Sequence, residues 1–222
     1  GIGASGTYDV LYEKYGYESQ TISTSLTAGD TVFQDVQLVP IPEYPFTVNV
    51  EDENGDPILG ADVRLDHGIN VFNEITNGLG SADFSLVFDD NYDVIVGKWG
   101  CITYCENLFI DENSSSITVV LPNGIYDDFS FDFGWSTTSD ASSGDWERVV
   151  PQAGSFPNAD FDSPEDCGDY AFVTDNEPGM SGNVSDGTVT LISPVFDMTS
   201  LTDPYIYYER WFYCFHGFEP YN

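Results

Sequence analysis

The chain has 222 residues, 41% of them hydrophobic and 15% aromatic, which is enough apolar material for folded cores and too much for a disordered acidic tail. Its 38 acidic and 5 basic residues give a formal net charge of -33, spread over both halves of the chain. A field of this sign repels nucleic acids and anionic membranes, whereas it suits salt-rich surroundings and bound calcium, and no run of 18 apolar residues suggests membrane insertion.

The N-terminal region contains half of an internal repeat with an offset of 84 residues. Each copy has a Tyr-Asp-Val strand followed by a Lys-aromatic-Gly turn. These segments are Thr7-Tyr8-Asp9-Val10 with Lys14-Tyr15-Gly16-Tyr17, and Asn91-Tyr92-Asp93-Val94 with Lys98-Trp99-Gly100-Cys101. The second copy has a front half, residues 43–84, that the first copy lacks. We therefore expect residues 1–40 to be the C-terminal half of a domain, completed by other parts of the protein or by a neighbouring copy.

Residues 43–122 are expected to form a complete β-sandwich. Short segments of alternating hydrophobicity recur about every ten residues, separated by the turn signals Asn54-Gly55 and Asn77-Gly78. The segments are Phe46–Val50, Ala61–Leu65, Ala82–Leu86, Tyr92–Val96 and Ser116–Leu121. No stretch of 12 residues has a convincing helical stripe, so the pattern predicts an all-β fold.

The order of these motifs resembles the carboxypeptidase regulatory-like (transthyretin-like) domain. The matching positions are Asp52, Gly55, Pro57, Gly60, Ala61, Val63, Thr76, Gly80, Tyr92-Asp93-Val94, Lys98, Gly100 and Leu121-Pro122. The sequence departs from the family at Cys101, where the family usually has the Tyr that Tyr17 keeps in the first copy. The resemblance covers residues 1–122 and implies tandem transthyretin-like or immunoglobulin-like sandwiches, which serve as rigid modules of extracellular proteins.

From Asn123 onwards the sequence motifs differ from those of the repeat copies. The next motifs are an acid-acid-Phe…Gly-Trp opening, Trp-Glu-Arg, Gly-x-Tyr-Ala and Leu-x-Ser-Pro-x-Phe-Asp. They occupy Asp127–Trp135, Trp146–Arg148, Gly168–Ala171 and Leu191–Asp197. Together they resemble the MAM-like jelly-roll domains of secreted bacterial proteins of the Bacteroidetes kind. The resemblance implies that residues 123–222 are the N-terminal part of a jelly-roll whose remaining strands lie beyond Asn222.

An aromatic segment near the C-terminal end is expected to be a central strand of this jelly-roll. Alternation places Tyr205, Tyr207 and Trp211 on one face and Tyr208 and Phe212 on the other. Both faces are mainly apolar, so we expect burial on both sides. The alternative is an exposed aromatic platform that stacks on glycans.

The four cysteines lack zinc-like spacing. Pairing Cys101 with Cys105 and Cys167 with Cys214 would keep each disulfide within one domain. The first pair requires a bulge or loop, because the ends of one straight strand are too far apart for a bridge. The alternative is that they are buried free thiols.

The usual catalytic motifs are missing: there is no nucleophile elbow, no His-Glu-x-x-His and no phosphate-binding loop. His67 is expected to be an exposed loop histidine, and His216 a turn or interface residue. With 38 acids some close carboxylate pair will always occur, so such a pair does not indicate a glycosidase. We expect no enzyme activity in this segment.

Calcium is the better site hypothesis, because it prefers six to eight oxygen ligands from loops. Carboxylate side chains are densest in Asp127-Asp128 and in Asp160–Asp166. The resemblance to MAM-like domains assigns an ion to the acid near the opening Phe, which is Asp128, with weaker claims for Asp162, Asp166 and Asp169. The alternative is a solvated acidic loop.

These features predict a non-catalytic structural or adhesive module array of a secreted or cell-surface protein, acting as a stalk, filament or surface-binding element. Its partners would be other domains of the same chain, neighbouring copies, or glycans. One alternative is an accessory region of a secreted hydrolase, such as a metallopeptidase, whose catalytic domain lies elsewhere. The other alternative is a carbohydrate-binding module.

Overall fold

The computed structural model describes residues 5–152, 161–176, 183–199 and 202–212. These residues form strands, turns and extended segments, and the all-β prediction is confirmed for them. None of them forms a helix that could cross a membrane. The chain divides into two compact units. Unit 1 comprises Gly1–Glu51, Pro57–Val94 and Glu106–Val119, and unit 2 comprises Asp52–Asp56, Ile95–Cys105 and Val120–Asn222.

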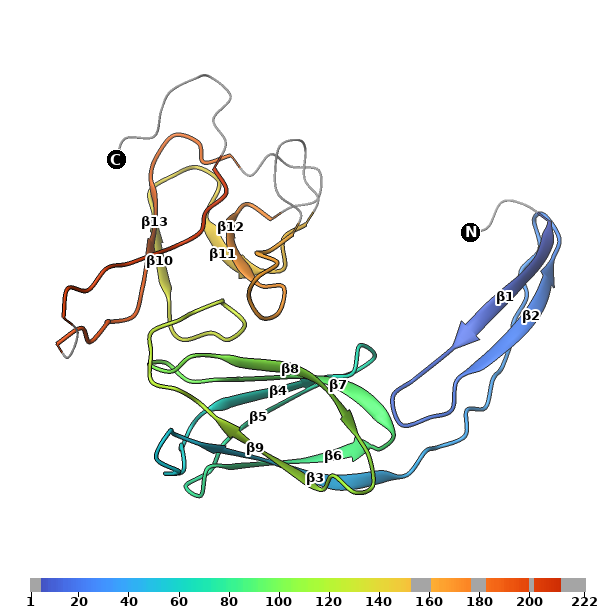
Figure 1. Cartoon of the computed structure of the whole chain (residues 1–222). Helices are drawn as coiled ribbons and strands as arrows, with labels where there is room; N and C mark the ends of the chain where they lie inside the picture. The colour runs from blue at the N-terminus through green and yellow to red at the C-terminus, as the bar shows by residue number, and fades with distance from the viewer. Residues whose placement is uncertain (1–4, 153–160, 177–182, 200–201, 213–222) are drawn as a thin grey trace. The chain divides into compact units, whose positions relative to one another are not determined.

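The expected sandwich is built from two β-sheets (Figure 1). One has three strands in the order β6-β3-β9, and the other has four in the order β5-β4-β7-β8. The strands are β3 (Glu43–Glu51), β4 (Asp62–Asp66), β5 (Val71–Ile75), β6 (Ser81–Val87), β7 (Asp90–Gly97), β8 (Tyr104–Ile110) and β9 (Ser116–Val120).

The core of the sandwich follows from the alternation in these strands. In β3 the side chains of Phe46, Val48 and Val50 are buried while the residues between them are partly exposed. The facing strand β4 buries Val63 and Leu65 by the same rule. Antiparallel pairing places Phe46 opposite Phe84 of β6. A one-residue slip would turn each of these rows towards solvent, so the core fixes the register.

Thr76 and Gly80 hold the turn between β5 and β6. The buried Thr76 hydroxyl donates to the Ile58 carbonyl at 2.6 Å and accepts from the Ala61 N–H at 2.8 Å. Gly80 has φ +72°, and a Cβ there would lie 2.5 Å from the Val50 carbonyl oxygen. Both sequence positions belong to the turn pattern that predicted the sandwich.

The first repeat copy forms a hairpin of β1 (Gly6–Tyr12) and β2 (Gln20–Leu26) (Figure 1). With the offset of 84 residues, these strands coincide with the neighbouring strands β7 and β8 of the sandwich. The two segments therefore have nearly the same strand boundaries. Tyr92 and Val94 are fully buried in the second copy, whereas their counterparts Tyr8 and Val10 are partly or largely exposed.

Residues after Asn123 form two small antiparallel sheets. One pairs β10 (Ser136–Ser139) with β13 (Val189–Ile192), and the other pairs β11 (Trp146–Val149) with β12 (Ala171–Thr174). A cluster of aromatic rings, Phe129, Trp135 and Phe172, packs beside them with centroid separations of 5.1–6.0 Å. The jelly-roll assignment and the division into three domains remain predictions.

Candidate functional site: an acidic cluster beside a disulfide

The opening motif of the third segment folds into two successive aspartate turns. Asp127 accepts the Phe129 N–H at 2.9 Å, and Asp128 accepts the Ser130 N–H at 2.9 Å. Phe129 takes a positive φ of 62° between them. Aspartate favours such turns because its short carboxylate reaches the backbone two residues on. The second oxygen of Asp127 is also used, since Trp135 Nε1 donates to it at 2.7 Å.

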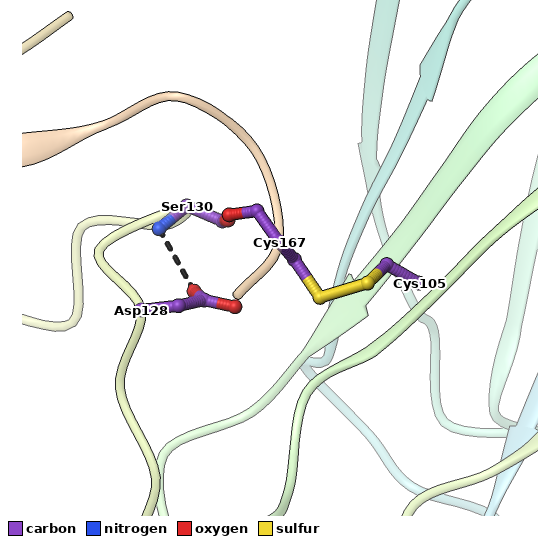
Figure 2. The surroundings of a disulfide bond; sticks show 4 residues. All are labelled: Cys105, Asp128, Ser130 and Cys167. Carbon is purple, nitrogen blue, oxygen red and sulfur yellow. Dashed lines mark hydrogen bonds between the residues drawn. A yellow bond between two sulfur atoms is a disulfide. The ribbon is translucent and has the colours of Figure 1, made fainter. Parts of the chain in front are cut away.

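Asp128 is the unusual member of this pair. Its residue is only 2% exposed, and its Oδ2 atom is buried without a hydrogen-bond partner. Figure 2 shows one carboxylate oxygen on the Ser130 N–H and the other directed away from it. Burial raises the pKa of Asp128 above its usual value, because a buried charge lacks the stabilisation that water provides. A buried, half-satisfied carboxylate is the kind of group that a cation stabilises.

Two further predicted ligands lie close enough to interact with Asp128 electrostatically. Asp162 Oδ2 and Asp166 Oδ1 are also buried without partners. Burial, then repulsion from Asp162 and Asp128, raises the pKa of Asp166 to about 7. Burial followed by repulsion from Asp128 and Asp166 raises the pKa of Tyr126 to about 12. The structure therefore brings Asp128, Asp162 and Asp166 into one negative cluster, and Asp169 repels Asp162 from its edge.

Asp169 occupies a different position from the other three. It is exposed, and it lines a solvent-open hollow together with Asp162, Asp166 and the apolar side chains of Val150 and Phe161. Among the described residues, no three Asp, Glu, His or Cys side chains converge closely enough to form a metal-ligand set. The cluster thus has the oxygen chemistry that calcium prefers, without a converged set of carboxylates.

A disulfide fixes the loop that carries these acids. Cys105 on β8 is bonded to Cys167, with the Cα atoms 6.0 Å apart (Figure 2). The buried Ser130 hydroxyl donates to the Cys167 carbonyl. Cys167 packs with Ile95 and Phe131 in a small apolar cluster. The bridge therefore ties the loop that carries these acids to β8, and the Ser130–Cys167 hydrogen bond holds it beside the Asp128 turn.

The predicted pairing of cysteines is wrong. Cys105 is bonded to Cys167, which excludes both the Cys101–Cys105 and the Cys167–Cys214 bridges, and Cys214 lies outside the described residues. Cys101 is a free, half-buried thiol whose pKa is raised by burial. The prediction assumed that each bridge stays within one sequence domain, whereas unit 2 combines Ile95–Cys105 with the third segment.

His67 is not the exposed loop residue that we expected. Its side chain is 13% exposed, and Nε2 lies 2.8 Å from Asp90 Oδ2. Burial acts to raise the pKa of Asp90, but the hydrogen bonds from His67 and from the Asn91 N–H outweigh it, and the pKa lies below its usual value. The imidazole packs against Tyr15 and Tyr92. The second histidine, His216, lies outside the described residues.

The aromatic segment near the C-terminal end also differs from its prediction. Residues 205–212 belong to none of the strands that the structure describes. Tyr205 is 88% exposed and Trp211 is 66% exposed. A strand is buried on both sides only when other layers of the fold pack against each of its faces, and these exposures show that no described residues do so here. The prediction of a buried central strand is therefore wrong for these residues.

Comparisons with known proteins add little to this description. No family model and no curated protein matches the chain. One similar solved structure, titled "The Bacillus anthracis TIE protein", has 10% sequence identity and a TM-score of 0.34. The match covers 54% of this chain and 24% of that chain, so this chain spans about a quarter of that protein. A likeness this weak carries no argument about fold or function.

Proposed function

We propose that the chain is a non-catalytic structural or adhesive module array of a secreted or cell-surface protein, and that calcium stabilises its third segment. The Cys105–Cys167 bridge supports the location, because disulfides persist mainly in oxidising compartments outside the cytosol. The charge of -33 suits a cation-rich medium. The tandem copies support a structural role, since repeated sandwiches commonly act as spacers and binding surfaces.

The observation that carries the calcium proposal is the buried, half-satisfied carboxylate of Asp128. Calcium would neutralise it together with Asp162 and Asp166, whose buried oxygens also lack partners. Backbone carbonyls and water would supply the remaining ligands, as they do in many loop sites for this ion. The ion would supply a local positive charge and hold the disulfide-linked loop against the Asp128 turn.

The test compares thermal unfolding of the full chain in calcium and in a chelator. If the calcium concentration is about 100 times the dissociation constant, binding stabilises the folded state by about 2.7 kcal/mol. Asp128→Asn removes the charge while keeping the side-chain shape, so this variant should lose the calcium response. The control is Asp145→Asn, an exposed acid in the same unit. Equal unfolding temperatures of the wild type in calcium and chelator would refute the proposal.

A carbohydrate-binding module is the second candidate, favoured by the exposed aromatic segment 205–212. Exposed rings of Tyr and Trp can stack on sugar faces. Affinity electrophoresis in gels containing soluble polysaccharides tests this idea. Retardation that Trp211→Ala abolishes would support it, and unretarded migration in every polysaccharide gel would argue against it. The hydrolase-accessory alternative rests on the resemblance alone.

A further inference from the structure

Both repeat copies contain the same hydrogen-bonded turn, which we call the junction turn (residues 14–17 and 98–101). The Tyr17 N–H donates to the Lys14 carbonyl at 3.1 Å, and the Cys101 N–H donates to the Lys98 carbonyl at 2.9 Å. The third residue is a glycine with positive φ in each copy, +77° at Gly16. Only glycine enters this region freely, so the Lys-aromatic-Gly pattern encodes the turn.

The junction turn also holds the chain where it leaves each copy. Two hydrogen bonds join the turn to the departing segment, and both recur in the second copy, where the turn residues are offset by 84 positions and the departing residues by 83. They are Glu18 N–H to Val39 carbonyl at 2.8 Å and Ile41 N–H to Gly16 carbonyl at 2.8 Å, then Ile102 N–H to Pro122 carbonyl at 2.9 Å and Gly124 N–H to Gly100 carbonyl at 3.1 Å. The aromatic residue before the glycine is thereby fixed at the point where the next module begins.

In the first copy this aromatic residue is Tyr15, and it contacts the sandwich that follows. Its ring meets His67 and Phe72 edge-on, both at a centroid distance of 5.0 Å. Its hydroxyl accepts the Val87 N–H at 2.6 Å and lies 2.8 Å from the Tyr92 hydroxyl.

The hydroxyl contacts of Tyr15 form a closed ring of hydrogen bonds. Tyr92 donates its proton to the Val87 carbonyl at 2.8 Å. The Tyr15 hydroxyl must therefore donate to Tyr92, since the Tyr92 proton is already used. Every polar atom in the ring is satisfied, which suits a group held in a partly buried interface.

In the second copy the equivalent residue is Trp99, and it contacts the segment that follows that copy. Its ring lies 5.2 Å from Phe196 and 6.1 Å from Phe133, centroid to centroid. Its Nε1 donates to the Val195 carbonyl at 3.3 Å. The same repeat position thus combines ring packing with a hydrogen bond to the next module in both copies, although the surrounding residues are unrelated.

We infer that Tyr15 and Trp99 are junction aromatics: in each repeat copy this residue helps to dock the copy onto the module that follows it in the chain, and in the second copy it acts alongside the Cys105–Cys167 bridge. In both copies the receiving surface includes two aromatic rings and a backbone hydrogen-bonding group. This role goes beyond the proposed calcium binding and depends on different residues. A failure of either proposal therefore leaves the other intact.

Amide hydrogen exchange of the full chain tests the role of Tyr15. In Tyr15→Ala, exchange at the Val87 amide and across the Gly6–Leu26 hairpin should rise at least tenfold, while β3 and the rest of β6, residues 81–86, stay protected. Tyr15→Phe keeps the ring and should raise exchange mainly at Val87. The control is Phe33→Ala, because Phe33 is 92% exposed. Changes below twofold in Tyr15→Ala, or equal loss of protection throughout the sandwich, would overturn the inference.

Chymotrypsin cleavage at Phe196 tests the role of Trp99. Trp99→Ala should raise the initial cleavage rate at least tenfold, because the segment around Phe196 opens more often. Trp99→Phe should raise it less, since ring packing is retained. Phe109→Ala, which removes an exposed aromatic of β8, is the control. A rate in Trp99→Ala within twofold of the wild type would overturn the inference for the second copy.

Discussion

Removal of the Cys105–Cys167 disulfide should destabilise unit 2 strongly. The bonded residues are 62 positions apart. In the chain-entropy treatment, closing a loop of that length lowers the unfolded-state entropy by an amount worth about 4 kcal/mol at 25 °C. The bridge also anchors the buried Cys167 carbonyl that receives the Ser130 hydroxyl. We therefore expect Cys105→Ser/Cys167→Ser to lose up to about 4 kcal/mol of unfolding free energy.

Urea unfolding of the full chain, followed by tryptophan fluorescence, measures this loss. All four tryptophans, Trp99, Trp135, Trp146 and Trp211, are described residues of unit 2, so fluorescence reports on that unit. Cys101→Ser is the matched control, because Cys101 is a free thiol and its removal breaks no bond. Non-reducing peptide mapping should recover Cys105 linked to Cys167. A Cys101–Cys105 linkage, or equal destabilisation by Cys101→Ser, would refute the reasoning.

Three further predictions concern single side chains. Gly80→Ala should destabilise unit 1 by about 1–3 kcal/mol more than Gly68→Ala in urea unfolding. Both glycines lie in unit 1 and have positive φ, but only a Cβ at residue 80 meets the Val50 carbonyl. Equal losses would contradict this. Thr76→Val should lower the free energy of unfolding by about 3 kcal/mol, because two buried backbone groups lose their hydrogen-bond partner. Thr76→Ser keeps the hydroxyl and should lower it much less. Similar losses in the two variants would show that the hydroxyl is unimportant. In chelator, the folded-state pKa of Asp166, about 7, exceeds the unfolded value of about 4. The stability that this difference contributes is full below pH 4 and is lost as the pH rises through 7. Asp166→Asn should therefore make the unfolding temperature depend less on pH in this range.

The strands of the sandwich could be predicted because their signal is local. Alternation in Phe46–Val50 and Ala61–Leu65, with glycine-containing turns between strands, fixes both the strand and the buried face. The repeat was visible for the same reason, since Gly16 and Gly100 encode the same turn wherever they occur. Each of these features depends on residues close together in sequence.

The disulfide could not be predicted, because it depends on how distant segments meet. The pairing of Cys105 with Cys167 requires that the loop before β12 lies beside β8, and no periodicity reports such proximity. The burial of His67 has the same origin, since its ring is covered by Tyr15 from the other repeat copy. The acidic loop could be identified from composition, but the burial of Asp128 Oδ2 without a hydrogen-bond partner could not.

The docking residues Tyr15 and Trp99 were missed although a signal was present. Comparison of the copies emphasised identical positions, and this position changes from Tyr to Trp. What is retained is an aromatic ring with a polar hydrogen, which both contacts use. Chemically similar residues at the same repeat position, next to the point where the chain leaves the copy, would have identified this contact better than identical residues. For Tyr205–Phe212 the error is the opposite one: the apolar pattern suggested a buried strand, but such a pattern alone does not ensure that other parts of the fold cover it.

The central claim is that the acidic cluster of the third segment binds calcium, and equilibrium dialysis of the full chain against radioactive calcium tests it most directly. Dialysis at physiological ionic strength, with magnesium present, suppresses weak binding to the many surface acids. The account predicts about one calcium ion per chain in the wild type and in Asp145→Asn, and none in Asp128→Asn. No bound calcium in the wild type at millimolar concentration, or unchanged binding in Asp128→Asn, would contradict it.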